Sequence, residues 1–134
     1  MARHFRELVV WQRAMRLVEA VYCLTRTLPP DERFGLTSQL RRSAVSVPSN
    51  IAEGHERRSR RDYRRFILVA RGSLAELETQ IELAVRVGLT SESAVVDATS
   101  LAEEVGRLLN AIEQALGRDE DSSSRIREGE ADYP

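Results

Sequence analysis

A row of polar side chains with helical spacing is the first feature of this sequence that could take part in specific chemistry. Its members are separated by three or four residues, so a helix would place them all on one face. They are Gln39, Arg42, Ser46, Asn50 and Glu53, here called the polar stripe. Serine and asparagine favour caps and turns over helix faces. We therefore expect the polar stripe to hydrogen-bond to a specific surface, either another helix or a partner or subunit interface.

An arginine-rich segment follows the polar stripe. It contains the arginine cluster, which is Arg57, Arg58, Arg60, Arg61, Arg64 and Arg65. Such a patch suits nucleic-acid binding, because each neutralised phosphate releases condensed counterions. The alternative is a solvated face that pairs with nearby carboxylates or with a neighbouring subunit. Base stacking has little support, since the nearby aromatic residues Tyr63 and Phe66 fall on or beside apolar helix positions.

Residues suited to catalysis or to metal and cofactor binding are few. Neither histidine, His4 or His55, lies in the Glu-x-x-His motif that di-iron bundles use. The glycines are isolated, so no glycine-rich phosphate loop is present. Cys23 has no histidine near it in sequence and is expected to be a buried or half-buried thiol, not a nucleophile. We predict a protein that is not an enzyme and has no catalytic residues, no metal and no cofactor.

Apolar residues recur at intervals of three and four in four segments, as they do in packed helices. The first segment ends at Pro29 and Pro30, and the second begins between residues 31 and 37 and ends at Gly54. The third starts with Ser59 as its cap and ends at Gly88, and the fourth begins after Thr90 or Ser91. The pattern predicts an all-α, antiparallel up-down-up-down four-helix bundle with short loops.

Length and charge divide the chain into one folded domain and a tail. The 134 residues are enough for one core, and residues 1–117 hold 17 Arg and 15 acidic residues. Residues 118–134 hold 3 Arg and 6 acidic residues with little apolar surface, so they are predicted to form a disordered acidic C-terminal tail. A single cysteine and the lack of a long apolar run lead us to expect a cytoplasmic protein that does not enter a membrane.

Two features indicate association with further copies of the chain. The first helix carries two apolar stripes, which form a wider apolar arc than one bundle core needs. Gly72 and Gly106 lie inside helical patterns, where glycine costs about 1 kcal/mol relative to alanine, and close helix–helix approach would offset that cost. We infer a homo-oligomer.

The segment from Gly35 to Gly54 resembles the signature of a four-helix bundle protein family encoded in intervening sequences of bacterial 23S rRNA genes. Residues 8–12, 70–80 and 103–110 are similar to further family segments, and the resemblance covers residues from about 5 to 116. The sequence departs from the family at His55, where an aromatic residue is common. The resemblance implies a ring-like homopentamer. Related accessory proteins of diversity-generating retroelements are expected to bind a reverse transcriptase and nucleic acid.

Two functions remain open at this point. The first is a non-enzymatic oligomer that associates with RNA or another nucleic acid through the arginine cluster. The second is a protein-interaction scaffold or adaptor, for example for a reverse transcriptase, whose polar stripe binds the partner without direct nucleic-acid contact.

Overall fold

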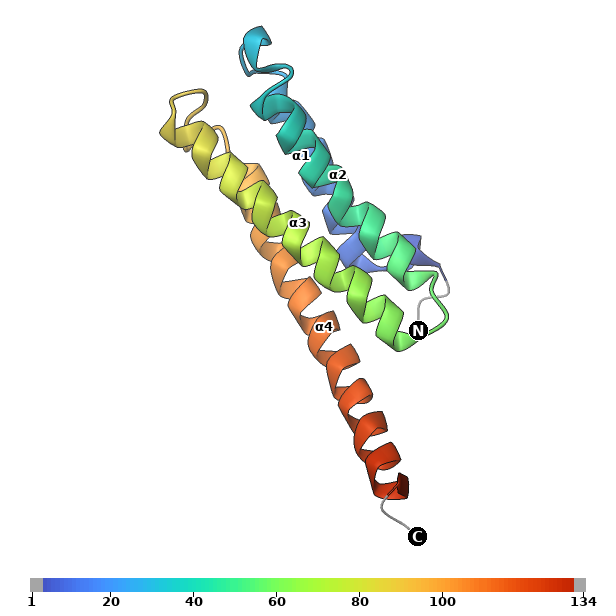
Figure 1. Ribbon diagram of the computed structural model, residues 1–134. Coiled ribbons are helices and arrows are strands. Elements are labelled where there is room, and N and C mark those ends of the chain that lie inside the picture. Colours follow the sequence, from blue (N-terminus) through green and yellow to red (C-terminus); the bar gives the residue numbers. More distant parts are fainter. Residues whose placement is uncertain (1–3, 132–134) are drawn as a thin grey trace.

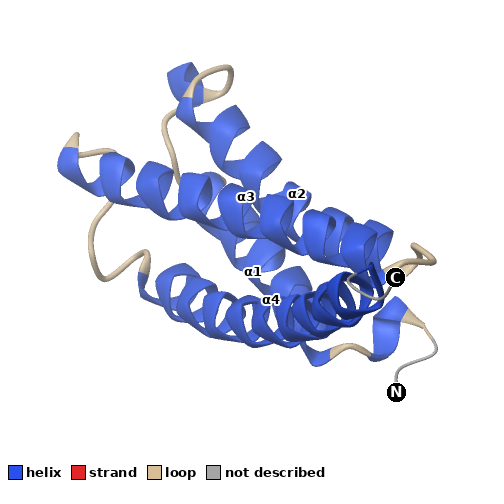
Figure 2. Ribbon diagram, turned by 60° about the horizontal axis from the view of Figure 1, so that its bottom comes forward, coloured by secondary structure: helices blue, strands red, loops and turns tan. Residues whose placement is uncertain are grey.

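The protein consists of four long helices and two short 3-10 helices (Figure 1). The computed structural model describes residues 4–131, with side chains through Arg118. The elements are η1 (Phe5–Glu7), α1 (Val9–Thr25), η2 (Pro30–Glu32), α2 (Leu36–His55), α3 (Arg60–Arg86) and α4 (Val96–Ala131). Every regular element among the described residues is helical, as Figure 2 shows, which confirms the predicted all-α class with four main helices.

Several predicted helix ends are confirmed. The α1 helix ends before Pro29, α2 begins at Leu36, and the Ser59 hydroxyl oxygen accepts a hydrogen bond from the Asp62 backbone N–H at 3.0 Å as the cap of α3. Gly88 has a φ of +83°, a conformation that glycine adopts without strain, and it turns the chain after α3. Turn and cap residues therefore set these boundaries locally.

The predicted start of α4 is wrong. The helix begins at Val96, because Ser91 instead caps the preceding turn by accepting a hydrogen bond from the Ala94 N–H at 3.2 Å. It continues through Gly117 to Ala131, into the segment that the sequence predicts to be a disordered tail. Residues 132–134 of the predicted tail lie outside the described residues.

All four main helices contribute fully buried side chains to one core, among them Leu17, Leu40, Ile67 and Leu109. Each helix packs against its neighbours in the chain, and α4 also packs against α1. Much of the apolar arc of α1 outside its fully buried positions is used inside the bundle, since Trp11, Val18 and Ala20 pack against the core. The wide apolar arc of α1 is therefore largely explained within one chain.

Two smaller expectations are corrected by the structure. Cys23 is exposed, because it lies on the outer side of α1 between the core positions Val21 and Leu24. A Cβ atom added at Gly72 would meet no atom within 4 Å, so no helix of the same chain approaches closely there. At Gly106 an added Cβ would lie 3.4 Å from Leu74 Cδ2, an ordinary contact.

No helix within residues 4–131 combines the length and apolar character needed to cross a membrane.

Candidate nucleic-acid interface

The polar stripe is divided between the contact of α2 with α3 and the solvent. Ser46 Oγ lies 2.8 Å from Ser73 Oγ of α3. Asn50 Nδ2 donates to the Ser46 carbonyl oxygen at 2.8 Å and to its hydroxyl oxygen at 2.9 Å. The other three members, Gln39, Arg42 and Glu53, are exposed. Ser46 and Asn50 thus bond within the chain at the α2–α3 contact, and Glu53 pairs with Arg57 in solvent.

Sequence reasoning missed the most buried polar pair between these helices. Ser43 Oγ donates to Gln80 Oε1 at 2.7 Å, and the two residues are only 4% and 7% exposed. Gln80 lies on the apolar line of α3 beside Ile81, and a polar residue at a core position was the signal that could have identified it. We call Ser43, Ser46, Asn50, Ser73 and Gln80 the α2–α3 seam. Since Ser43 meets Gln80 and Ser46 meets Ser73, the two helices run antiparallel.

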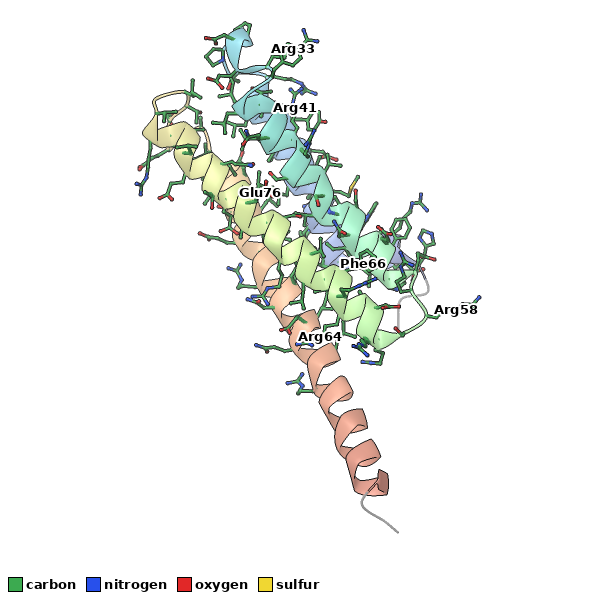
Figure 3. The ribbon with its side chains drawn as sticks, viewed as in Figure 1. Arg33, Arg41, Arg58, Arg64, Phe66 and Glu76 are labelled. Carbon is green, nitrogen blue, oxygen red and sulfur yellow. The ribbon has the colours of Figure 1, made fainter. Side chains whose placement is uncertain are left out.

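The arginine cluster lies in the turn between α2 and α3 and in the first turns of α3. This turn is at the end of the bundle where the chain begins (Figure 1). Arg58 is exposed in the turn and points away from the bundle, as Figure 3 shows. Arg60 and Arg61 are exposed on the first turn of α3. The fold therefore gathers several guanidinium groups at one end of the molecule.

Phe66 lies between two members of the cluster that come from different segments. The guanidinium carbon of Arg57 is 4.8 Å from the centre of the Phe66 ring, and that of Arg65 is 5.2 Å from it. Arg57 Nη2 also donates to Glu53 Oε1 at 2.9 Å, and Arg65 Nη2 lies 4.0 Å from Asp62 Oδ1. The two arginine side chains remain 44% and 68% exposed. Exposed ion pairs of this kind contribute little to stability, so these arginines remain accessible to other anions.

Arg64 contacts α4. Its Nε and Nη2 atoms donate to Glu113 Oε1 at 3.3 and 2.9 Å. The Glu113 side chain is only 16% exposed, and Arg71 Nη1 lies 3.8 Å from its other oxygen. Arg64 therefore joins α3 to α4. We call the remaining five members, Arg57, Arg58, Arg60, Arg61 and Arg65, the arginine end.

A further arginine reaches this end of the bundle from the start of the chain. The guanidinium of Arg6 lies 5.1 Å from the centre of the Phe5 ring, and that ring meets Trp11 edge-on at 5.3 Å. The η1 helix, which contains Arg6, contacts both α1 and α2. Local sequence patterns could not identify this residue, because it is about fifty positions away from the arginine cluster.

The junction of α2 and α3 is tightly packed beneath the arginine end. A Cβ atom added at Gly54 would lie 2.7 Å from Phe66 Cβ and 3.2 Å from Tyr63 Cδ1, so α2 needs glycine where it meets α3. The ring of Tyr63 packs edge-on against His55, with 5.8 Å between ring centres. Burial raises the pKa of Tyr63, which remains a neutral phenol at physiological pH.

At the other end of α3, a groove of about 650 Å³ separates it from α4. Ala75, Val85 and Val96 give it apolar walls, while Glu78, Glu82 and Glu92 add carboxylates. Burial, and then the charge of Glu103, raise the pKa of Glu78. Among the described residues, no three His, Cys, Asp or Glu side chains form a group that could hold a metal ion. Because of its three carboxylates, the groove is opposite in charge to the arginine end.

These features define a class: a small helical bundle with a polar contact between two helices and a basic surface at one end. The family model described as 23S rRNA-intervening sequence protein matches residues 6–111, and the chain belongs to this family. The predicted family is thus confirmed. Among curated proteins, no sequence matches the chain.

A solved structure shares this fold. It is a protein of unknown function from the S23 ribosomal protein family of Bacteroides thetaiotaomicron. The two chains are 24% identical, with a TM-score of 0.73, and the match covers 78% of this chain and 98% of that chain. At this level of identity the likeness establishes the fold.

Proposed function

We propose that this protein is a non-enzymatic, cytoplasmic, oligomeric four-helix bundle that binds RNA phosphates through the arginine end. The observation that carries the proposal is the convergence of Arg57 and Arg65 beside Arg58, Arg60 and Arg61 on an exposed end of the bundle. Guanidinium groups donate two parallel hydrogen bonds to phosphate oxygens, and each contact releases counterions from the nucleic acid. Arg64 is not part of the proposed surface, because it pairs with Glu113.

The proposed assembly is a ring-like homopentamer of up-down-up-down bundles. Its support within the chain is an apolar row on the outer face of α3, where Leu68 is 41% exposed and Val69 and Leu83 are 47% exposed. Gly72 lies in the same row with open space around it, which leaves room for a neighbouring helix. A ring would present several copies of the arginine end, so the overall affinity would exceed that of a single copy.

The second candidate is a protein adaptor without direct nucleic-acid contact. The groove between α3 and α4 favours it, because its walls are apolar and its carboxylates suit a basic partner segment. The polar stripe gives it less support than expected, since Ser46 and Asn50 bond within the seam. We rank this candidate second.

Titration of the wild-type protein with labelled RNA at several salt concentrations tests the proposed function. The logarithm of the binding constant should fall linearly with the logarithm of the salt concentration, with a slope of about −0.9 for each duplex phosphate that is contacted. The same titration with a labelled basic peptide tests the adaptor candidate. Peptide binding without RNA binding at low salt would replace the first proposal with the second.

A further inference from the structure

The aromatic rings at the arginine end are already in contact with other side chains of the same chain. Phe66 is contacted by Arg57 and Arg65, and Phe5 by Arg6. Tyr63 packs against His55. Single-strand binding proteins need open aromatic faces on which unpaired bases can stack. These three rings are already engaged within the chain, which disfavours base stacking on them.

The same contacts restrain the arginines that would bind phosphate. A guanidinium over an aromatic ring gains about 0.5–1 kcal/mol at an exposed site. Ordering a free arginine side chain during binding has an entropic cost, so prior restraint by the ring lowers that cost. The N–H groups at the edge of each guanidinium remain able to donate hydrogen bonds.

The position of Phe66 is itself fixed by backbone packing. Its Cβ atom lies only 2.7 Å from the position that a Cβ atom at Gly54 would occupy, so the base of Phe66 packs closely against α2. Arg57 comes from the turn after α2, and Arg65 precedes Phe66 on α3. Phe66 thus contacts two guanidinium groups that come from different segments.

We propose that Phe66 is a positioning residue that holds Arg57 and Arg65 for two backbone phosphates, and that the arginine end therefore prefers double-helical nucleic acid to unpaired strands. This inference rests on the proposed function and specifies its ligand. Double-helical RNA presents phosphates in a regular array and is read mainly through its shape and backbone. RNA and DNA duplexes share this chemistry, and the experiment includes both.

The test compares Phe66→Leu with Phe34→Leu, a matched control. Phe34 is 89% exposed and also has an arginine over its ring, with Arg33 at 5.3 Å, but Figure 3 shows Arg33 at the opposite end from Arg58. Each protein is titrated with an RNA hairpin duplex, a DNA duplex and single-stranded polyuridine of equal phosphate number. Phe66→Leu should weaken duplex binding about 3- to 10-fold, while Phe34→Leu stays within twofold of wild type.

The shape of the salt dependence separates positioning from charge. Phe66→Leu keeps every arginine, so the slope against log salt should be unchanged while the affinity falls. Phe66→Tyr retains the ring and should restore wild-type binding. If Phe66→Leu lowers the melting temperature, two other results still test the proposal. The wild-type preference for duplex over polyuridine tests the duplex preference, and the binding of Phe66→Tyr tests the positioning role.

The possible failures are distinguishable. Absence of wild-type binding to every polymer at low salt would reject the proposed function and this inference with it. Wild-type binding that is equal in Phe66→Leu at an unchanged melting temperature, or tighter for polyuridine than for both duplexes, would overturn the positioning role or the duplex preference and leave the proposed function standing.

Discussion

The α2–α3 seam and the arginine end occupy consecutive parts of the sequence but use their polar groups in opposite ways. In the seam, uncharged hydroxyl and amide groups bond to each other between two helices, as Ser43 does with Gln80. At the arginine end, charged groups stand in solvent and are restrained by the Phe66 ring and by exposed carboxylates. The seam stabilises the structure, whereas the exposed guanidinium groups of the arginine end can still bind a ligand.

The difference follows from the cost of burial. A hydroxyl or amide can be buried once it has a partner, whereas burying a guanidinium also requires compensation of its charge. Arg64 illustrates the second requirement, because the half-buried Glu113 carboxylate is its partner on α4. Buried polar residues at helical spacing therefore indicate helix contact, as at Ser43, whereas exposed arginines such as Arg57 and Arg65 keep their guanidinium groups at the surface.

The largest expected effect is at the junction of the two regions. Gly54→Ala would place a Cβ atom 2.7 Å from Phe66 Cβ, and overpacking of this kind costs about 1–3 kcal/mol. We expect a lower free energy of unfolding, measured by denaturant titration at fixed protein concentration. The matched control is Gly106→Ala, whose Cβ makes an ordinary 3.4 Å contact and which should not destabilise the protein. Equal stability of the two variants would contradict the close packing at Gly54.

The seam should be more sensitive than the exposed part of the polar stripe. Gln80→Ala removes one acceptor of the buried Ser43 hydroxyl, which keeps the Leu40 carbonyl oxygen at 3.2 Å, so the expected cost is about 0.5–1.5 kcal/mol. Gln39→Ala removes an exposed amide on α2 and should change stability by no more than about 0.5 kcal/mol. Thermal and denaturant unfolding measure both. If Gln39 proves the more costly substitution, an interface outside this chain must bury it.

A smaller effect separates Arg64 from its neighbours in the sequence. Arg64→Gln removes a partly exposed ion pair with Glu113 and should lower stability by about 0.5–1 kcal/mol without weakening RNA binding. Arg58→Gln should weaken RNA binding and leave stability unchanged. Parallel unfolding and RNA titrations compare the two. If Arg64→Gln weakens RNA binding and Arg58→Gln lowers stability instead, Arg64 belongs to the RNA-binding surface and Arg58 does not.

Much of the fold could be predicted from sequence because its signals are local. Prolines after α1, the Ser59 cap and the Gly88 turn each act within a few residues. The start of α4 was predicted too early, because Ser91 caps the turn that precedes the helix instead of the helix itself.

The sites were less predictable, because their geometry depends on contacts between distant segments. The polar stripe was identified, but its partners Ser73 and Gln80 lie on another helix. The arginine cluster was identified, but Glu113 lies 49 residues beyond Arg64. Periodicity specifies which face a residue occupies, and only the packing of the helices decides what meets that face.

The most direct test of the central claim compares two variants with the same change in net charge. One changes Arg57, Arg58, Arg61 and Arg65 to Gln, and the other changes four exposed arginines elsewhere, Arg16, Arg26, Arg33 and Arg107, to Gln. Glutamine supports helices nearly as well as arginine, so both variants should remain folded by circular dichroism. RNA titrations across salt then measure affinity and slope. We expect the first variant to lose at least about tenfold in affinity, with a shallower salt slope, and the second to stay within about threefold of wild type. Equal losses in both variants, or wild-type binding by the first, would contradict the assignment of the arginine end as the nucleic-acid interface.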